Sequence, residues 1–436
     1  MGNTIQLQWD NPHTSGLRRH DRRSGPYLAY APSPLAKAAL TLPTELSLAA
    51  AEVERRIHRL RQSPLLNSTS RFLLRSEAIA SSRIEGITPA PQQLALAELA
   101  QSELVQKVNE SARLAANNVK VVRAAVEEIA DAPLITLEHL LSLQRNLLPD
   151  SPELHGVRQK QNWVGGSAYH PLDADFVPPP PEYVGPLLED LLLYANGADH
   201  SPVVQAALVH AQFETIHPFA DGNGRVGRAL IHAVLARRGL VAGMVLPVSP
   251  VLATLSRRYV AALTAFRAIP AGASPAPAHD DAAHSGRLQW IAFFLEACTA
   301  ACEQAEMIEA ELADVAADWK EKLAALPGSG GRERALRKDS AALRILEGLA
   351  ATPALTASSV SSAYGLSLNA ARGGLETLEA AKILTTVSIG PGRRAYLAPA
   401  ILDTLAYAER RLASTLFDTR ISPPPGGVPA PPHAQG

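Results

Sequence analysis

The stretch His217-Pro-Phe-Ala-Asp-Gly-Asn-Gly-Arg-Val-Gly-Arg228 combines an imidazole, a carboxylate, three glycines and two arginines in twelve positions. Such a loop suits phosphate binding, because glycine has no Cβ and lets backbone N–H groups approach an anion. Residues 225–238 have the pattern of a helix, whose first turn points its free N–H groups and positive dipole end at the same anion. Arg225 and Arg228 share one face of that helix and can each grip phosphate oxygens. The stretch therefore predicts a phosphate-binding loop beside a histidine.

Composition restricts the class of protein. The 436 residues correspond to roughly three domains. The formal charge of −1 argues against a chain-wide electrostatic role on nucleic acid or membranes. Cys298 and Cys302, four apart in a helical pattern, are expected to be buried thiols rather than a disulfide framework or a metal site. We find no signal peptide and no apolar stretch long enough to span a membrane, so we expect a soluble cytoplasmic protein.

Helical periodicity dominates the chain, so the predicted fold class is all-α. Apolar residues recur every three or four positions from Thr44, which is expected to cap the first helix. The expected helices cover residues 44–60, 70–85, 92–130, 136–148, 182–195, 202–215, 225–238, 250–267, 287–326, 340–349, 356–363 and 367–381.

Two segments break this pattern. Residues 155–177 have the texture of short strands and turns, which predicts a hairpin, and Pro178–Pro181 must be extended. Near the C-terminus, residues 384–389 and 394–397 flank the turn Gly390-Pro391-Gly392 and also predict a hairpin. Three short helices followed by such a two-stranded wing indicate a winged helix-turn-helix domain.

The stretch quoted first resembles the signature of the Fic (filamentation induced by cyclic AMP) family, His-x-Phe-x-Asp/Glu-Gly-Asn-Gly-Arg-x-x-Arg, and matches it at every fixed position. The resemblance extends over about residues 45–300 and includes the segment before Phe176-Val177-Pro-Pro-Pro-Pro181. It implies an all-helical core with a β-hairpin flap. It also implies a protein adenylyltransferase, which transfers AMP from ATP to a Ser, Thr or Tyr hydroxyl of a target protein.

The resemblance also implies roles for single residues. His217 would be the general base that takes the proton from the attacking hydroxyl, work that suits histidine at neutral pH. Asp221 would hold Mg²⁺ against the α- and β-phosphates. Phe219 is expected to anchor the loop in the core. The residues implied to bind ATP are Gly222, Asn223, Gly224, Arg225, Val226, Gly227 and Arg228, with Tyr259 beside the nucleoside. Val260 departs from the tyrosine pair that the family often has there, and core packing is the other interpretation of Tyr259.

A metal-ligand interpretation of the same region is weaker. The side chains His210, Glu214, His217 and Asp221 are spaced four, three and four apart, as a ligand face on one helix would be. Pro218 and the glycines end that helix near residue 216, which takes the last two residues off the face. We therefore expect His210 to pack or to form a hydrogen bond.

A second motif lies upstream, at Ser81-Ser82-Arg83-Ile84-Glu85-Gly86. It matches the family's inhibitory motif, Ser/Thr-x-x-x-Glu-Gly/Asn, through Ser81, Glu85 and Gly86. A carboxylate in the last turn of a helix faces the negative end of the helix dipole, which indicates tertiary pairing or function. The resemblance implies that Glu85 pairs with Arg228 where the γ-phosphate should lie. A solvated glutamate, and a glutamate that supports removal of AMP, are the alternatives.

The predicted organisation follows the chain in six segments. They are an irregular N-terminal arm with a solvated basic run at 1–35, a helical region with the inhibitory helix at 36–130, the Fic catalytic core at 131–270, a helical extension and linker at 271–331, the winged-helix domain at 332–405, and a helix end with a disordered tail at 406–436. Residues 270–286 are expected to form a surface loop, and 327–331 the linker itself.

Partners other than ATP and a target protein stay open. The flap around Val157–Val164 would hold the target segment by strand pairing. Residues 339–399 carry five Lys or Arg and four Asp or Glu, whereas a DNA-reading domain is usually more basic. Arg372, Arg393 and Arg394 can still contact phosphates. Three alternatives therefore stay open. They are a homodimer, a DNA-binding regulator with a nucleotide-sensing Fic fold, and transfer of a group from another nucleotide donor.

Overall fold

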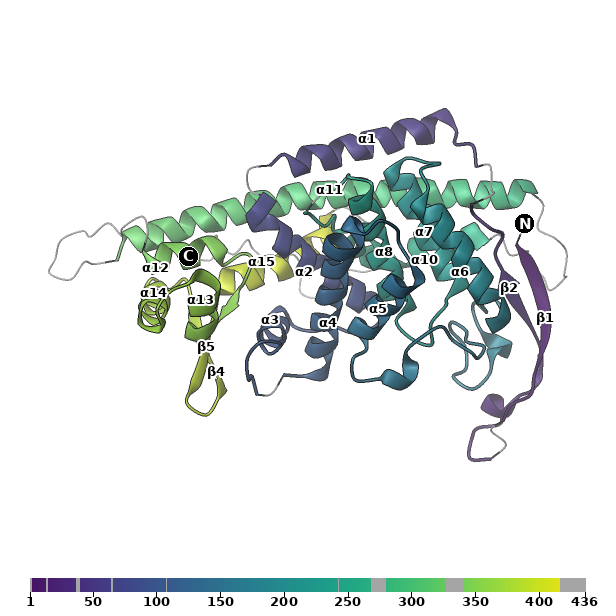
Figure 1. Ribbon diagram of the computed structural model, residues 1–436, viewed down its shortest axis with the longest axis horizontal. Helices are drawn as coiled ribbons and strands as arrows, with labels where there is room; N and C mark the ends of the chain where they lie inside the picture. The colour runs from purple at the N-terminus through teal and green to yellow at the C-terminus, as the bar shows by residue number, and fades with distance from the viewer. Residues whose placement is uncertain are drawn as a thin grey trace. The chain divides into compact units, whose positions relative to one another are not determined.

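The computed structural model describes residues 2–12, 15–36, 40–63, 66–106, 108–241, 243–267, 280–326 and 340–415 (Figure 1). The predicted linker at 327–331, most of the predicted surface loop and the predicted tail at 422–436 lie outside these ranges. The described part is mostly helical, as predicted, and none of its helices is both long and apolar enough to cross a membrane.

The chain divides into two compact units, and each is built from three separate stretches. The first unit contains residues 1–55, 121–242 and 255–298, and the second contains 56–120, 243–254 and 299–436. The division does not follow the six consecutive segments expected from the sequence. The reason is that three helices continue from one unit into the other, namely α1 (Thr44–Arg61), α4 (Glu110–Ala124) and α11 (Asp280–Ala324).

The core of the first unit is a helical bundle around α7 (Pro202–Ile216). Every residue of α7 from 203 to 216 is buried, so this helix has no solvent face and occupies the centre. The elements α6 (Pro181–Asn196), α8 (Asn223–Arg237) and α10 (Ser256–Arg267) all contact it. Around them lie α5 (Leu137–Leu147) and a π-helical turn, Ala125–Ile129. Proline at the first helical position starts α6 and α7, because a missing N–H costs nothing there.

The N-terminal arm, predicted as irregular, is instead a β-hairpin. Its strands β1 (Asn3–Trp9) and β2 (Gly25–Ala31) pair antiparallel from Asn3 opposite Ala31 to Trp9 opposite Gly25. The sequence Ile5-Gln6-Leu7-Gln8-Trp9 alternates apolar and polar residues, which is the period of a half-buried strand. That alternation was the signal for the hairpin. The basic run lies in the connecting loop, around the short 3₁₀ turn His20–Arg22.

The hairpin predicted over residues 155–177 is reduced to isolated pairing. Val164 and Phe176 form one antiparallel bridge, with Val164 N–H donating to the Phe176 carbonyl at 2.8 Å. Directly after Val164, Gly165 and Gly166 have φ values of +75° and +71°. Two successive left-handed residues turn the chain out of the ladder, so no regular strand continues beyond the bridge.

The second unit combines helices with a small sheet. Its strands β3 (Ala354–Leu355), β4 (Thr385–Gly390) and β5 (Arg393–Leu397) are antiparallel in the order β3-β5-β4. The helices of this unit are α2 (Leu66–Ile84), α3 (Pro91–Leu99), α9 (Val248–Thr254), α12 (Ala341–Gly348), α13 (Ala357–Tyr364), α14 (Leu368–Ala380) and α15 (Pro399–Thr415). Three helices followed by a hairpin thus appear in the expected order, and the winged-helix class stays a prediction.

Several predicted boundaries were wrong. The helix expected over 92–130 is divided into α3, α4 and the π-helical turn, because residues 100–106, 108 and 109 are not helical. Asn109 restarts it, since its Oδ1 accepts from Ala112 N–H at 2.7 Å. The helix expected over 250–267 is likewise two helices, α9 and α10. The predicted surface loop ends earlier than expected, because α11 already begins at Asp280. The predicted end of the winged-helix domain at residue 405 falls inside α15. Cys298 and Cys302 are buried thiols, as predicted.

Candidate functional site

His217 stands at the end of the central helix of the first unit. Helix α7 stops at Ile216, as Pro218 predicted, and His217 adopts a left-handed backbone with φ 50° and ψ 59°. Its N–H donates to the Phe213 carbonyl at 2.9 Å, and its half-buried ring places Nδ1 3.4 Å from the Glu214 carbonyl. A left-handed backbone is uncommon for a residue with a side chain and indicates a position that its surroundings enforce.

Arg158 helps to hold His217 in this conformation. Its Nε donates to the His217 carbonyl at 2.9 Å, and its Nη2 donates to the carbonyls of Ile216, at 3.5 Å, and Pro179. Burial lowers the pKa of Arg158 to about 10, with Glu182 acting against the shift, so the guanidinium stays charged at neutral pH. A cation on the last carbonyls of α7 also complements the helix dipole. The sequence had placed Arg158 only in a predicted strand.

The loop after His217 is fixed by the side chain of Asn223. Its Oδ1 accepts from Phe219 N–H at 2.8 Å, and its Nδ2 donates to the Phe219 carbonyl at 2.9 Å. Asn162 donates to the same carbonyl at 3.0 Å. The Phe219 ring is fully buried and lies edge-on to Phe213, with ring centres 5.8 Å apart, which confirms its predicted role as an anchor. The Asn223 side chain therefore holds the loop in shape, so it is the backbone N–H of Asn223 that can bind an anion.

The glycines of the motif have different tasks. Gly222 has a φ of +88° at the start of α8, and a Cβ there would lie 2.8 Å from Leu147 Cδ2. Gly227 lies where α8 packs on α7, and a Cβ would come within 2.5 Å of Glu214 Oε1. Val226 is completely buried. Val226 and Gly227 thus lie in the contact between helices, and this position does not support their predicted contact with ATP.

The charged residues of the motif gather at the first turns of α8. The side chains of Arg225 and Arg228 are buried, with residue exposures of 4% and 2%. Arg225 Nη2 lies 3.5 Å from Asp221 Oδ2, and Gly222 N–H donates to Asp221 Oδ1 at 2.6 Å. The Asp221 side chain itself is 52% exposed. A half-exposed carboxylate whose Oδ2 has only a 3.5 Å contact to Arg225 fits Mg²⁺, which takes one or two carboxylates together with substrate phosphates.

Gln144 on α5 is a buried residue that the sequence interpretation missed. Its Nε2 donates to the carbonyls of Asp221 and Leu154, at 3.3 and 3.0 Å, and its Oε1 accepts from Gly156 N–H at 2.8 Å. One amide thus ties the predicted metal-binding loop to the base of the flap. Nothing in a single glutamine on an amphipathic helix signals such a role.

Tyr259 lies in the packed core. It is 5% exposed, its hydroxyl is 2.8 Å from His210 Nε2, and its ring centre is 6.1 Å from that of Trp290. Burial lowers the pKa of His210 to about 3, so this histidine is neutral. These contacts confirm the expectation for His210 and match the core interpretation of Tyr259. The predicted contact between Tyr259 and a nucleoside stays a prediction.

The predicted inhibitory motif belongs to the second unit. Helix α2 ends at Ile84, and Gly86 follows with a φ of +78°. The Ser82 hydroxyl donates to the Ala78 carbonyl at 2.8 Å and accepts a hydrogen bond from Asn118 Nδ2 at 3.2 Å. These bonds fix the turn of α2 that precedes the motif's glutamate. Ser81 is also buried.

Charged side chains of α2 tie it to other elements of the second unit. Arg75 pairs with Glu98 of α3 at 2.6 Å and donates to the Ala351 carbonyl at 2.7 Å. Glu77 is fully buried and accepts from Ser249 N–H at 2.8 Å and from its hydroxyl. Arg83 pairs with Glu409 of α15 at 2.6 Å. The helix that carries Ser81 and ends just before Glu85 is therefore anchored to α3, α9 and α15.

The central part of the chain matches a known family. The model of the Fic/DOC family matches residues 134–235, which include the whole stretch from His217 to Arg228. A probable protein adenylyltransferase of Aquifex aeolicus is 31% identical over 181 residues, which are 41% of this chain and 52% of that protein. A protein adenylyltransferase Fic of Drosophila virilis is 37% identical over 111 residues, 24% of this chain and 21% of the relative. The chain thus spans about half of the first relative and about a fifth of the second.

Solved structures of Fic proteins resemble the chain more weakly. A Fic family protein of Desulfovibrio desulfuricans matches with a TM-score of 0.48 and 22% identity, over 82% of this chain and 97% of the other. Fic-1 of Caenorhabditis elegans matches with a TM-score of 0.43 and 19% identity, over 60% of this chain and 70% of the other. The assignment depends on the sequence match at the motif. The chain therefore contains a domain of the Fic/DOC family.

Proposed function

We propose that the protein is a protein adenylyltransferase that uses ATP and Mg²⁺. The observation that carries the proposal is the joint arrangement of His217 and α8. A left-handed turn sets the imidazole directly before a loop that leads into a helix N-terminus with two buried arginines. The names of the Aquifex and Drosophila relatives support the same activity.

The proposed reaction uses the chain's own groups at four points. The substrate hydroxyl attacks the α-phosphorus, and His217 takes the hydroxyl proton. The bond from the α-phosphorus to the bridging oxygen breaks, and pyrophosphate leaves. Backbone N–H groups at the start of α8, with Arg225 and Arg228, stabilise charge on the phosphates. Asp221 would hold Mg²⁺, which, when bound, neutralises negative charge on the phosphate oxygens.

We propose further that Glu85 restrains this activity by competing for Arg228. The support is the match of Ser81, Glu85 and Gly86 to the inhibitory motif and the firm anchoring of α2 within its own unit. A charge placed where the γ-phosphate should lie would hold ATP in an unproductive pose. Relief then requires either loss of the carboxylate or movement of the end of α2.

The test uses the full chain and α-labelled ATP. We expect Glu85→Gly to raise the incorporation of label into protein at least tenfold, which corresponds to about 1.4 kcal/mol. Glu45→Gly removes an exposed glutamate from the first turn of α1 and should leave incorporation at the wild-type level. Adding His217→Ala to the Glu85→Gly chain should abolish incorporation, and labelling that persists without the imidazole would refute the proposed base.

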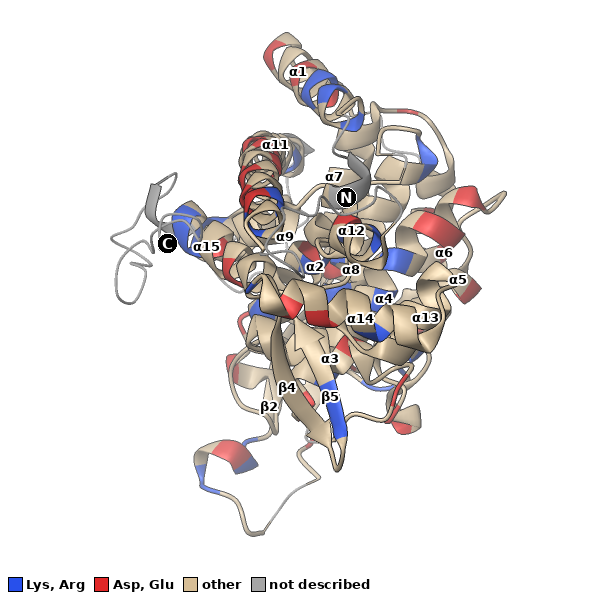
Figure 2. Cartoon of the chain, turned by 90° about the vertical axis from the view of Figure 1, so that its left-hand side faces the viewer, with Lys and Arg blue, Asp and Glu red and all other residues tan. Residues whose placement is uncertain are grey.

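A second candidate function, phosphate-backbone binding by the C-terminal helices and sheet, has one observation in its favour. A cavity of about 290 Å³ in the second unit is lined by Arg372, Arg393 and Arg394 together with the Thr356 and Ser358 side chains. Figure 2 shows basic residues on β5 at this place. Glu103 also lines the cavity and pairs with Arg393 at 3.5 Å, which reduces its positive charge.

A gel shift with genomic DNA fragments decides this candidate. Binding that weakens with salt and is lost in an Arg372→Ala, Arg394→Ala chain would establish it. Binding that survives both substitutions, or no binding at low salt, would reject it. Size-exclusion chromatography with light scattering of the same samples decides whether the chain forms a homodimer.

A further inference from the structure

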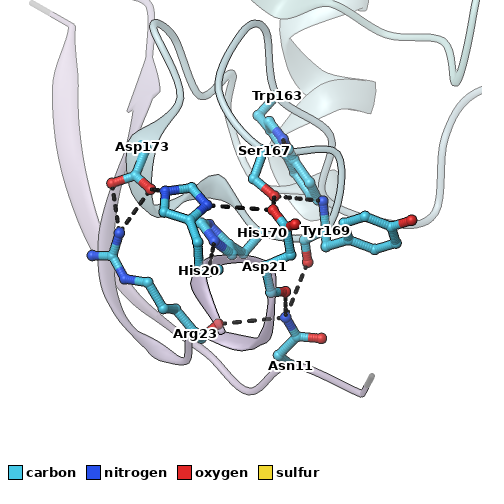
Figure 3. Close-up of polar contacts among 9 residues, drawn as sticks. All are labelled: Asn11, His20, Asp21, Arg23, Trp163, Ser167, Tyr169, His170 and Asp173. Carbon is cyan, nitrogen blue, oxygen red and sulfur yellow. Dashed lines mark hydrogen bonds and ion pairs between the residues drawn. The ribbon is translucent and has the colours of Figure 1, made fainter. Parts of the chain in front are cut away.

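The loop of the N-terminal hairpin meets the flap at a cluster of ligand-type side chains. His20 and Asp21 come from the 3₁₀ turn between β1 and β2, and His170 comes from the flap (Figure 3). One nitrogen or carboxylate oxygen from each lies within 4.8 Å of the others. Among the residues that the structure describes, this is the one group of three His, Cys, Asp or Glu side chains close enough to hold an ion.

The ring of His170 is oriented as a metal ligand would be. The residue is fully buried, and its Nε2 lies 2.8 Å from the His20 carbonyl oxygen. A carbonyl can only accept, so the hydrogen is on Nε2 and a neutral ring carries its lone pair on Nδ1. That Nδ1 is buried and has no hydrogen-bond partner among the described residues. Histidines that bind metals commonly donate their second nitrogen to a backbone carbonyl in this way.

His20 shows the same division between its two nitrogens. Its Nε2 lies 3.0 Å from Asp173 Oδ2, and Arg23 holds that carboxylate with bonds of 2.7 and 2.9 Å. With the proton on Nε2, the lone pair of Nδ1 faces Asp21 Oδ1 at 3.3 Å. Two lone-pair atoms at that distance need either a proton or a positive ion between them. Ligands around a tetrahedral ion with bonds of about 2.0–2.1 Å are themselves about 3.3 Å apart.

Asp21 is held ready for the same purpose. The Ser167 hydroxyl donates to Asp21 Oδ1 at 2.8 Å, as Figure 3 shows. This bond orients Asp21 Oδ1, which lies 3.3 Å from His20 Nδ1. Each of the three candidate ligands therefore has an outer partner that fixes it: Ser167 for Asp21, Asp173 for His20, and the His20 carbonyl for His170.

We propose that His20, Asp21 and His170 form a site for a divalent transition-metal ion of the Zn²⁺ class, with a fourth position open to water. Two imidazoles and one carboxylate favour such ions over Mg²⁺ and Ca²⁺, which prefer oxygen ligands alone. The ion joins segments about 150 residues apart and fastens the hairpin loop to the flap. Trp9 and Trp163, edge to face with ring centres 5.3 Å apart, pack at the same junction. The site does not depend on the proposed adenylyltransferase activity.

The test is calorimetric titration of the full, metal-stripped chain with Zn²⁺. We expect one site per chain, and replacement of Zn²⁺ by Co²⁺ should give the strong visible absorption of a four-coordinate ion. His20→Ala and Asp21→Asn alter partly exposed positions, so their folding is expected to survive, and each should weaken Zn²⁺ binding by about 100-fold or more. Asp173→Asn removes an outer partner and should weaken it about 10- to 100-fold. His58→Ala, an exposed histidine on α1, should leave binding unchanged.

Two results would overturn the site. Absence of Zn²⁺ binding to the wild-type chain would mean that His20, Asp21 and His170 hold no ion and that His20 only bridges Asp21 and Asp173. Binding that is equal in the wild-type, His20→Ala and Asp21→Asn chains would place the ion elsewhere. A second readout is thermal unfolding, because an ion that binds only the folded chain raises the wild-type midpoint. The midpoint of the His170→Ala chain should then not respond to Zn²⁺.

Discussion

At the scale of single residues, Gly227 sets how closely α7 and α8 pack. Gly227 has no room for a methyl group, since a Cβ would lie 2.5 Å from Glu214 Oε1 and 3.0 Å from Phe213 Cδ1. We expect Gly227→Ala to destabilise the fold by about 1–3 kcal/mol through overpacking between α7 and α8. Gly373→Ala, in the interior of α14 with nothing within 4 Å, should instead stabilise by about 0.5–1 kcal/mol. Urea denaturation of both variants measures this, and equal effects would contradict the packing argument.

His210 makes stability depend on pH. Its pKa is lowered to about 3 by burial, whereas an unfolded histidine titrates near 6.5. Below pH 6.5 the unfolded chain therefore binds a proton that the folded chain does not bind. The free energy of unfolding consequently falls as the pH falls. Between pH 7.5 and 5.5 this residue should remove about 1.4 kcal/mol. The pH dependence measured by urea denaturation should be weaker by that amount in His210→Gln. An unchanged dependence would mean that His210 is protonated in the fold.

At the scale of elements, Arg158 holds the end of α7 and the start of the Pro178–Pro181 segment together. Arg158→Ala should lower AMP incorporation in the Glu85→Gly background by about 100-fold, because small displacements of a catalytic group cost that much. Arg158→Lys should rescue little of the loss, since an ammonium cannot match a planar fork that reaches several carbonyls. Steady-state rates, with circular dichroism as the folding control, check this. Full activity in Arg158→Ala would show that His217 keeps its place unaided.

The elements also show what the sequence can and cannot predict. The motif helices and their ends were predictable, because Pro202, Pro218 and Gly222 mark them locally. The break of the predicted 92–130 helix was not, since residues 100–109 contain neither proline nor glycine. That segment instead contacts the sheet of its own unit, with Gln106 N–H donating to the Ile389 carbonyl at 2.9 Å. Tertiary pairing overrode local propensity there.

For the site, the residues that act on ligands were visible in the sequence and the residues that position them were not. His217 and Asp221 belong to a contiguous pattern. Gln144 and Arg158 act through carbonyl oxygens brought near by the fold, at 3.3 and 2.9 Å, and carry no local signature. The same limit applies to His20 and His170, which lie 150 residues apart.

At the scale of the whole molecule, α2 links the proposed inhibitory glutamate to the C-terminal part of the second unit. The bond from Arg83 to Glu409 lies two residues before Glu85 in the chain. Burial raises the pKa of Glu409, and Arg83 opposes that shift. We expect Glu409→Ala to loosen the end of α2 and to raise AMP incorporation several-fold in a chain that keeps Glu85. Glu311→Ala removes the ion pair between Glu311 of α11 and Arg411 of α15, and it serves as the matched control. Equal activities in the two variants and the wild type would show that the contact between α2 and α15 has no effect on inhibition.

The central claim is that the loop and helix beside His217 transfer AMP rather than phosphate. The most direct measurement compares ATP labelled at the α-phosphate with ATP labelled at the γ-phosphate, each incubated with the Glu85→Gly chain and a cell lysate. Label from the α-position should appear on protein, label from the γ-position should not, and His217→Ala should remove the signal. Protein that carries the γ-label, or α-label that is indifferent to His217, would contradict the account.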